Sequence, residues 1–336
     1  MNLSQLQPYI ITGLGIILFV IVVAAVVNIM FKSALNHRGD GSPALRYLQS
    51  EDFPGLIADP IRFLGNKKQV LRGYLYYRDS FQTFKELVIF AHGIGSGHTA
   101  YTTEINRLAQ EGFMVLAFDY TGCVLSSGKA MKSIIQPLVD MDFALRFVES
   151  RSDLSSLKRY IVGHSWGAYV AMNSVLLKKH RVDKVVSMSG FLSPVHAAVG
   201  SRAYLNILYP FFYMHGFWRY GRYATYNGLK AVRKSKVPML FVHGQLDNVI
   251  KPKSSFDKII KVVQKSHKEN IEFLAVENRR HSPFLTERAE TYLRKVILDK
   301  GVDNRKAPVA DYEVDYLQIT EEDETVMKTI VTFLKK

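Results

Sequence analysis

The sequence predicts an α/β fold in which a mostly parallel sheet carries helices on both faces. Short apolar runs alternate with helical stretches along most of the 336 residues, and each run is apolar throughout, as is typical of strands buried on both faces. A second observation is a serine flanked by glycines where one such run meets a helix-prone segment. A third is a long uncharged segment near the N-terminus, which precedes the predicted domain.

The uncharged segment covers residues 10–31 and consists mainly of Ile, Val, Leu and Phe. A helix of this length spans the roughly 30 Å hydrocarbon core of a bilayer, so we predict one transmembrane helix after a short tail at 1–9. The tail has no Lys or Arg and the apolar run is long, which favours an uncleaved anchor over a signal peptide. Lys32, Arg38 and Arg46 follow the helix, so the positive-inside rule predicts an anchor in the cell membrane with the rest of the chain cytoplasmic.

Glycines and prolines interrupt residues 32–60, which are therefore predicted as a linker before a domain at 61–336. Helical stretches are expected between the strands, and the acidic tail leads into a closing helix at about 326–334. The predicted strands lie at about 70–77, 87–91, 114–118, 160–163, 184–189, 239–243 and 271–276.

The serine motif is Gly-His-Ser-Trp-Gly at 163–167, between the strand at 160–163 and a helical run. In so tight a strand-to-helix turn, only glycines fit two positions either side of the serine, and the serine hydroxyl stands clear of the sheet. The pattern therefore predicts Ser165 as a nucleophile. The pentapeptide alone has little weight, because about one chain in ten of this length contains it by chance.

The partners of such a serine follow it in the order acid, then histidine. Asp247 lies in the loop after the strand at 239–243, and His281 lies in the loop after the strand at 271–276. We therefore predict Asp247 as the acid and His281 as the base. Asp119 also follows a strand and is an alternative acid, although it precedes the serine.

A glycine-rich loop at 92–97 follows the strand at 87–91. Because its backbone N–H groups are sterically free to face a ligand, we predict that Ile94 and Trp166, the residue after the nucleophile, supply the N–H groups of an oxyanion hole. A structural role is the alternative for each histidine at a strand end, namely His92, His164 and His243. Further candidate substrate contacts are His92, Gly93 and Trp218.

From about Gln69 onward the chain resembles the α/β-hydrolase superfamily, in the branch of lysophospholipase-like, monoacylglycerol-lipase-like and serine-aminopeptidase-like serine hydrolases. It is most similar to membrane-anchored members from Gram-positive bacteria. The resemblance rests on Ala-His-Gly at 91–93, the serine motif at 163–167 and His-Gly-Gln-Leu-Asp at 243–247. It implies an α/β-hydrolase fold with an inserted cap.

The resemblance also implies the same three roles: Ser165 as nucleophile, His281 as general base and Asp247 as the acid that orients it. One segment departs from the branch, which often has Asp-x-Arg-Gly-x-Gly-x-Ser after its fourth strand. Here residues 119–126 read Asp-Tyr-Thr-Gly-Cys-Val-Leu-Ser, without the arginine and the second glycine.

Residues at about 191–236 form an insertion that is too long for a plain connection and is rich in aromatic residues. In the fold that the chain resembles, such an insertion caps the active site, and an apolar cap favours acyl or other hydrophobic groups and excludes water. Two alternatives stay open. The aromatic side chains pack on a core of their own, or they enter the bilayer interface together with Arg202, Arg219 and Arg222.

The formal net charge of +14 fits nucleic acid, an anionic membrane surface or an acidic substrate as partner. No nucleic-acid motif is present, so the basic groups at 62–68, 178–181 and 230–234 either face anionic lipids or form a solvated surface. No cluster has metal-ligand spacing, and the loop at 92–97 lacks the Lys of a phosphate-binding loop. We therefore expect neither a metal nor a cofactor. The single cysteine, Cys123, excludes an intramolecular disulfide.

Together these features predict a membrane-anchored serine hydrolase that cleaves carboxylic esters with lipid-like or other hydrophobic acyl groups through an acyl-enzyme. A serine peptidase or aminopeptidase, or an acyltransferase, would use the same catalytic groups. A non-catalytic membrane scaffold that keeps the fold is the alternative from another class. The oligomeric state is left open.

Overall fold

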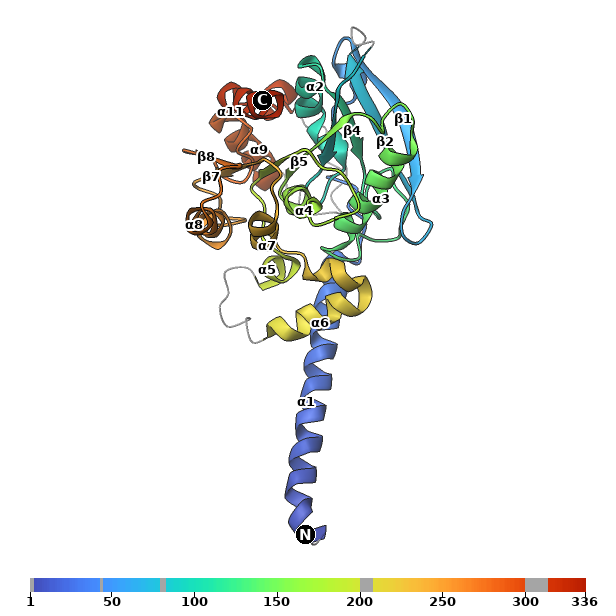
Figure 1. Ribbon diagram of the computed structural model, residues 1–336, viewed down its shortest axis with the longest axis vertical. Helices are drawn as coiled ribbons and strands as arrows, with labels where there is room; N and C mark the ends of the chain where they lie inside the picture. Colours follow the sequence, from blue (N-terminus) through green and yellow to red (C-terminus); the bar gives the residue numbers. More distant parts are fainter. Residues whose placement is uncertain (1–2, 43–44, 79–82, 200–207, 300–313) are drawn as a thin grey trace.

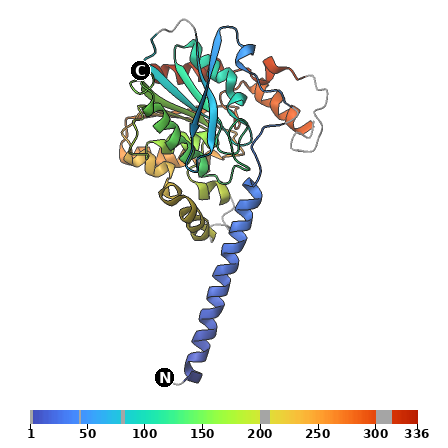
Figure 2. The same cartoon turned by 90° about the vertical axis from the view of Figure 1, so that its right-hand side faces the viewer.

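The computed structural model describes residues 3–42, 45–78, 83–199, 208–299 and 314–336. A long helix, α1 (Leu3–Leu35), stands out from a rounded domain, with the N-terminus at its far end (Figures 1 and 2). Within it, Gln5–Ile29 is long and apolar enough to cross a membrane, with a mean hydropathy of 3.1. A signal sequence near an N-terminus also meets this criterion of length and hydropathy.

The domain is built on an eight-stranded sheet in the order β1-β2-β4-β3-β5-β6-β7-β8. Strands β1, β2 and β4 pair antiparallel, and all other neighbours pair parallel, so the predicted mostly parallel sheet is confirmed. The strands are β1 (Leu56–Leu64), β2 (Val70–Arg78), β3 (Glu86–Ala91), β4 (Met114–Phe118), β5 (Lys158–His164), β6 (Lys184–Met188), β7 (Met239–Gly244) and β8 (Ile271–Val276).

The first strand, β1, is absent from the sequence prediction, which placed residues up to 60 in a linker and began the domain at 61. Pro54 is interpreted there as a breaker, and Pro60 as the approximate end of the linker. The strand lies at the edge of the sheet and pairs with β2 alone, with Pro60 opposite Tyr74. A proline that lacks an N–H is tolerated in such an edge strand, because one side of it needs no ladder partner.

Two apolar layers sandwich the sheet, because side chains alternate along each strand. In β3, Leu87 and Ile89 pack with helices α3, α4, α7 and α8 on one face. Val88 and Phe90 pack with α2, α9 and α11 on the other face. These helices are α2 (Thr102–Gln110), α3 (Gln136–Ser150), α4 (Trp166–Ser174), α7 (Gly228–Lys234), α8 (Phe256–Ser266), α9 (Glu287–Asp299) and α11 (Glu324–Lys335), with the short α10 (Tyr316–Ile319) beside α9.

The predicted insertion contains α5 (Pro194–Val199), α6 (Tyr209–Tyr220), a 3₁₀ turn at Gly221–Thr225 and α7. Residues 200–207, with the predicted interfacial Arg202, lie outside the described ranges. Helix α6 packs beside α1 below the domain (Figure 1), where Val27, Val195 and Phe212 form a buried cluster.

The segment that follows α1 is packed on the domain along part of its length. Leu35 is buried in the main core. The N–H of Gly39 donates to the carbonyl of Gly122, and the N–H of Gly41 donates to the carbonyl of Gly95, both at 2.9 Å. This part of the predicted linker at 32–60 therefore connects the end of α1 to the loops after β4 and β3.

Candidate active site

Ser165 lies in the turn between β5 and α4 with φ 55° and ψ −110°. Two glycines make this turn possible. A Cβ on Gly167 would overlap the carbonyl oxygen of Ala91, and a Cβ on Gly163 would overlap the carbonyl of Gly167. The turn therefore packs directly on the end of β3, and Ser165 is held in a backbone conformation that residues with a side chain rarely adopt.

The structure brings Ser165, His281 and Asp247 together from the carboxyl ends of three strands. The Oγ of Ser165 lies 2.8 Å from Nε2 of His281, and Nδ1 of His281 lies 2.9 Å from Oδ2 of Asp247. Asp247 follows β7, and His281 lies in the loop after β8. Ser165 and Asp247 are buried, whereas the side chain of His281 is 21% exposed. The imidazole thus joins a buried acid to a hydroxyl.

Asp247 is held as a carboxylate by its donors. Its Oδ1 accepts hydrogen bonds from the N–H groups of Val249 at 2.8 Å and Ile250 at 2.9 Å. Burial opposes the charge, but hydrogen bonds from His243 and His281 outweigh it and lower the pKa of Asp247 well below its usual range. The Nε2 of His243 also donates to the carbonyl of Ile250 at 2.8 Å, which gives His243 a structural role.

A hydrogen-bonded chain of neutral groups links the loops around Ser165. The N–H of Gly93 donates to the hydroxyl of Tyr101 at 3.1 Å, and that hydroxyl donates to Nδ1 of His164 at 2.8 Å. The Nε2–H of His164 then donates to the carbonyl of His281 at 2.8 Å. Burial lowers the pKa of His164 to about 3, so its ring stays neutral and keeps this pattern.

The backbone groups predicted for an oxyanion hole belong to the loop after β3 and to the start of α4. Trp166 is the first residue of α4, a position where a helix leaves the N–H without an intrahelical partner. Its indole is buried and donates to the carbonyl of Ile134 at 2.8 Å, so the side chain has a packing role. Ile94 is in the loop that adjoins the turn, since a Cβ on Gly93 would lie 3.7 Å from the carbonyl of His164.

The other three candidate substrate contacts have different surroundings. Both ring nitrogens of His92 are occupied, by the carbonyl of Gly93 and the N–H of Tyr120, and burial lowers the pKa of His92 to about 4. The N–H of Gly93 is used by Tyr101. Trp218 is 86% exposed on α6, so its indole does not form a wall around Ser165. The structure therefore places none of the three against the serine hydroxyl.

The alternative acid, Asp119, is bound elsewhere. Its Oδ1 accepts hydrogen bonds from the backbone N–H and Nδ1 of His98, each at 2.8 Å, and its Oδ2 accepts from the N–H of Leu125 at 3.0 Å. Burial opposes the charge, yet His98 holds the pKa of Asp119 at about 2. Asp119 therefore braces the loops after β3 and β4. Sequence reasoning missed His98 and Tyr101, because neither belongs to a recognisable motif.

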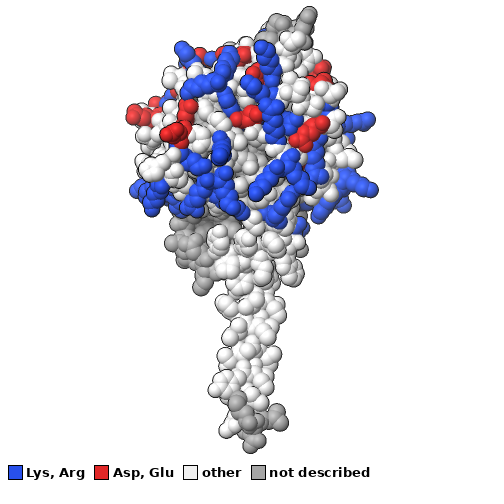
Figure 3. Space-filling model, in the orientation of Figure 1, with Lys and Arg blue, Asp and Glu red and all other residues white. Residues whose placement is uncertain are grey.

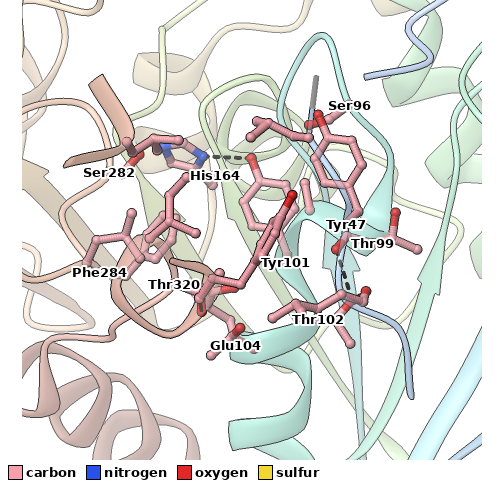
Figure 4. A pocket seen from close by; sticks show the side chains of 18 of the residues that line it. Tyr47, Ser96, Thr99, Tyr101, Thr102, Glu104, His164, Ser282, Phe284 and Thr320 are labelled. Atoms are coloured by element: carbon pink, nitrogen blue, oxygen red, sulfur yellow. Dashed lines mark hydrogen bonds between the residues drawn. The ribbon is translucent and has the colours of Figure 1, made fainter. Parts of the chain in front are cut away.

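A cavity of about 240 Å³ adjoins the site through Ser96, His164 and Ser282, which are close in the chain to Ile94, Ser165 and His281. Figure 4 shows His164 and Tyr101, joined by their hydrogen bond, in its wall. The remaining walls are mostly apolar and come from residues 45–48, the start of α2 and α9–α10. Among the residues that the structure describes, no group of His, Cys, Asp and Glu could hold a metal ion.

One protein family model matches part of the chain. Residues 82–217 match the family model Hydrolase_4, described as serine aminopeptidase, S33. The match includes the glycine-rich loop and Ser165 but ends before Asp247 and His281. A curated relative, an epoxide hydrolase from Caballeronia sordidicola, is 28% identical over 102 residues, which cover 30% of this chain and 30% of that protein. The chain thus spans about a third of the length of that relative.

Two solved structures extend the similarity over most of the chain. The Pyrococcus furiosus esterase Pf2001 is 17% identical with a TM-score of 0.59, and the alignment covers 89% of this chain and 97% of that one. The acetyl xylan esterase from Paenibacillus sp. R4 is 18% identical with a TM-score of 0.53, over 84% and 94%. These structural similarities confirm the predicted α/β-hydrolase fold.

Proposed function

We propose that this protein is a membrane-anchored serine hydrolase that cleaves carboxylic esters of lipid-like or other hydrophobic acyl groups. The observation that carries the proposal is the continuous hydrogen-bonded run from Ser165 through His281 to Asp247. In this proposal Ser165 is the nucleophile, His281 the general base and Asp247 the acid that orients the imidazole. The order of these residues along the chain is that of α/β-hydrolases.

The reaction proceeds in two steps. The Oγ of Ser165 attacks the ester carbonyl while its proton moves to Nε2 of His281, and Asp247 stabilises the resulting imidazolium. The N–H groups of Ile94 and Trp166 stabilise the oxyanion, each contributing about 3 kcal/mol. The intermediate collapses as His281 returns the proton to the leaving alcohol. Water, deprotonated by His281, then attacks the acyl-enzyme, and His281 returns that proton to Oγ of Ser165 as the acid leaves.

Two features favour hydrophobic esters among possible substrates. The apolar helix α1 suits a membrane anchor, and its position directly before Lys32 and Arg38 favours a cytoplasmic domain. The exposed aromatic side chains of α6 suit amphiphilic molecules of the lysophospholipid kind.

An export-dependent reporter fused to the C-terminus tests the topology. We expect no signal from this reporter, and a signal would place the domain outside the cell.

A serine peptidase is the second candidate, favoured by the match to a family described as serine aminopeptidase. The same acyl-enzyme can form from an amide, and an acyltransferase differs only in the nucleophile of the second step. A scaffold without catalysis is the candidate from another class. An activity-based probe separates this last class from the other three.

The test is labelling by a fluorophosphonate probe in membranes that contain the full chain. We expect labelling of the wild type and none of Ser165→Ala. Ser189→Ala is the matched control, because Ser189 is also buried after a strand at positive φ, but its Oγ has no partner in the described part of the chain. An unlabelled but folded wild type would favour the scaffold. Esters of graded chain length and aminoacyl amides then separate esterase from peptidase.

A further inference from the structure

We infer that helix α6 is inserted into one leaflet of the membrane beside α1, and that the enzyme takes amphiphilic esters from that leaflet. The membrane position of α6 is inferred only from the contacts and the exposed surface of this helix. The substrate part rests on the proposed function. Three observations lead to the inference: the height at which α6 meets α1, the apolar character of its outer face, and its connection to the turn that carries Ser165.

The contact between the two helices lies within the apolar span of α1. Phe212 of α6 is buried together with Val27, and Val23 packs against the same cluster. The span ends at Ile29. With a rise of about 1.5 Å per residue, Val27 lies about 3 Å and Val23 about 9 Å inside that end. A bilayer that covers the span therefore meets α6 about 3–9 Å inside its edge, close to the depth of about 5–10 Å that in-plane helices occupy.

Most of the outer face of helix α6 is apolar, as its inner face is. Phe212 and Gly216 are buried against the protein. The outer face leaves Trp218 86% exposed and Phe217 48% exposed, and it also carries Tyr209, Tyr213 and Met214. The exposed Arg219 lies in the last turn of the helix. Tyr and Trp are enriched at the membrane interface, where an Arg side chain can reach the headgroups. A lipid leaflet therefore matches this surface in chemistry.

The charge distribution agrees with the same membrane position. In Figure 3, Lys and Arg side chains cover much of this face of the domain, including the half nearer α1, where Asp and Glu are scarce. Helix α1 itself shows no charged side chain in this view. Helix α7, the last helix of the insertion, contributes Lys230, Arg233 and Lys234. Basic residues close to an anionic leaflet contribute about 1 kcal/mol each to binding. Headgroups would thus meet the basic surface while acyl chains meet α6 and α1.

The inserted helix is also connected to the catalytic turn. Gly216 packs closely on Ile135, the residue before α3. A Cβ added at Gly216 would lie 3.0 Å from the side chain of Ile135. The neighbouring Ile134 accepts the hydrogen bond from the indole of Trp166, the residue after the nucleophile. These contacts connect the lipid-facing helix to the turn that carries Ser165. In the inferred arrangement, an amphiphile reaches the site from the leaflet that surrounds α6.

The chain itself supplies a probe of this position, because it contains two tryptophans, Trp166 and Trp218. The full chain would be reconstituted in vesicles whose lipids carry a spin-label quencher at the headgroup, at acyl carbon 5 or at acyl carbon 12. We expect strong quenching of the tryptophan fluorescence, greatest for the label at carbon 5. This quenching should disappear in Trp218→Phe. The buried Trp166 of that variant is the internal control. Ser165→Ala should quench like the wild type, whether or not the protein proves to be a hydrolase.

Absence of lipid quenching at Trp218 would overturn the inference. Quenching by aqueous acrylamide instead would mean that α6 lies in water, and protection from both quenchers would mean that a second copy covers it. The substrate part has its own test: Phe217→Glu should lower kcat/KM at least tenfold for a long-chain ester in vesicles, with a short soluble ester unaffected and Phe217→Leu close to wild type. Equal losses on both esters would contradict uptake from the leaflet.

Discussion

The guanidinium of Arg38 donates a hydrogen bond from Nη2 to the carbonyl of Val124 at 2.8 Å, which ties the segment after α1 to the loop after β4. The Nη1 group of Arg38 donates to the carbonyls of Ser126 and Gly128. Val124 has φ 28°, which a β-branched residue rarely adopts, so this loop needs external support. Arg38 reaches this loop from outside the predicted domain.

Replacement of Arg38 should therefore destabilise the catalytic domain as well as its attachment to α1. Hydrogen bonds from a charged donor contribute about 1.5–3 kcal/mol, and the side chain of Arg38 is 32% exposed, so we expect Arg38→Ala to cost about 2 kcal/mol. Thermal unfolding in detergent measures this loss. Arg62→Ala, an exposed arginine on β1, is the control and should change stability by less than about 0.5 kcal/mol. If Arg38→Ala and Arg62→Ala lowered the stability equally, the hydrogen bonds of Arg38 would contribute nothing to it.

A second prediction compares two buried tyrosines. The hydroxyl of Tyr101 connects Gly93 with His164, whereas the buried hydroxyl of Tyr169 has no partner in the part of the chain that the structure describes. Tyr101→Phe leaves a buried donor and a buried acceptor unpaired, and should cost about 1–3 kcal/mol in unfolding free energy. Because it loosens the loop of Ile94, it should also lower kcat about tenfold with little change in KM.

The control for this comparison is Tyr169→Phe, which removes an unsatisfied hydroxyl and should leave both stability and kcat unchanged or slightly improved. Unfolding in urea and ester kinetics under the same conditions measure the two variants. If both lost the same stability and activity, the hydrogen bonds of Tyr101 would have no special role.

The outline of the fold and the order of the site residues could be predicted, because both are written in local patterns. Buried parallel strands are continuous apolar runs, and the turn around Ser165 requires glycines at fixed positions. Asp247 and His281 could be found by their places after strands. Tyr101 and Arg38 could not, because their roles depend on which loops meet in space. Strand β1 was missed for a related reason, since only its place at the sheet edge makes Pro60 acceptable.

A third prediction concerns pH. Both ring nitrogens of the buried His180 face carboxylates on α3: Nε2 lies 2.6 Å from Asp142 and Nδ1 lies 2.9 Å from Glu149. The hydrogen bond to Asp142 raises the pKa of His180, while burial opposes the rise. Arg146 and Arg159 pair with the same two carboxylates. Since His has a pKa of about 6.5 in an unfolded chain, the folded protein holds this proton more strongly.

The stabilisation from His180 is therefore complete below about pH 6.5 and is lost as the pH rises through the higher folded-state pKa. We expect the free energy of unfolding of the wild type to fall across this window, and His180→Gln to remove that part of the slope. Urea unfolding between pH 6 and pH 9 measures both. Parallel profiles for the two proteins would show that His180 titrates alike in the folded and unfolded chains.

The last prediction separates the backbone strain at Ser165 from its chemistry. Ser165→Ala and Ser165→Gly both remove the nucleophile and its hydrogen bond to His281, so both should be inactive and unlabelled. Only glycine adopts φ 55° and ψ −110° without strain, which otherwise costs about 1–3 kcal/mol. The greater freedom of glycine in the unfolded chain offsets about 0.5–1 kcal/mol of this gain. Ser165→Gly should therefore be the more stable variant by about 1 kcal/mol in thermal unfolding, and the reverse order would mean that the turn stores no strain for catalysis.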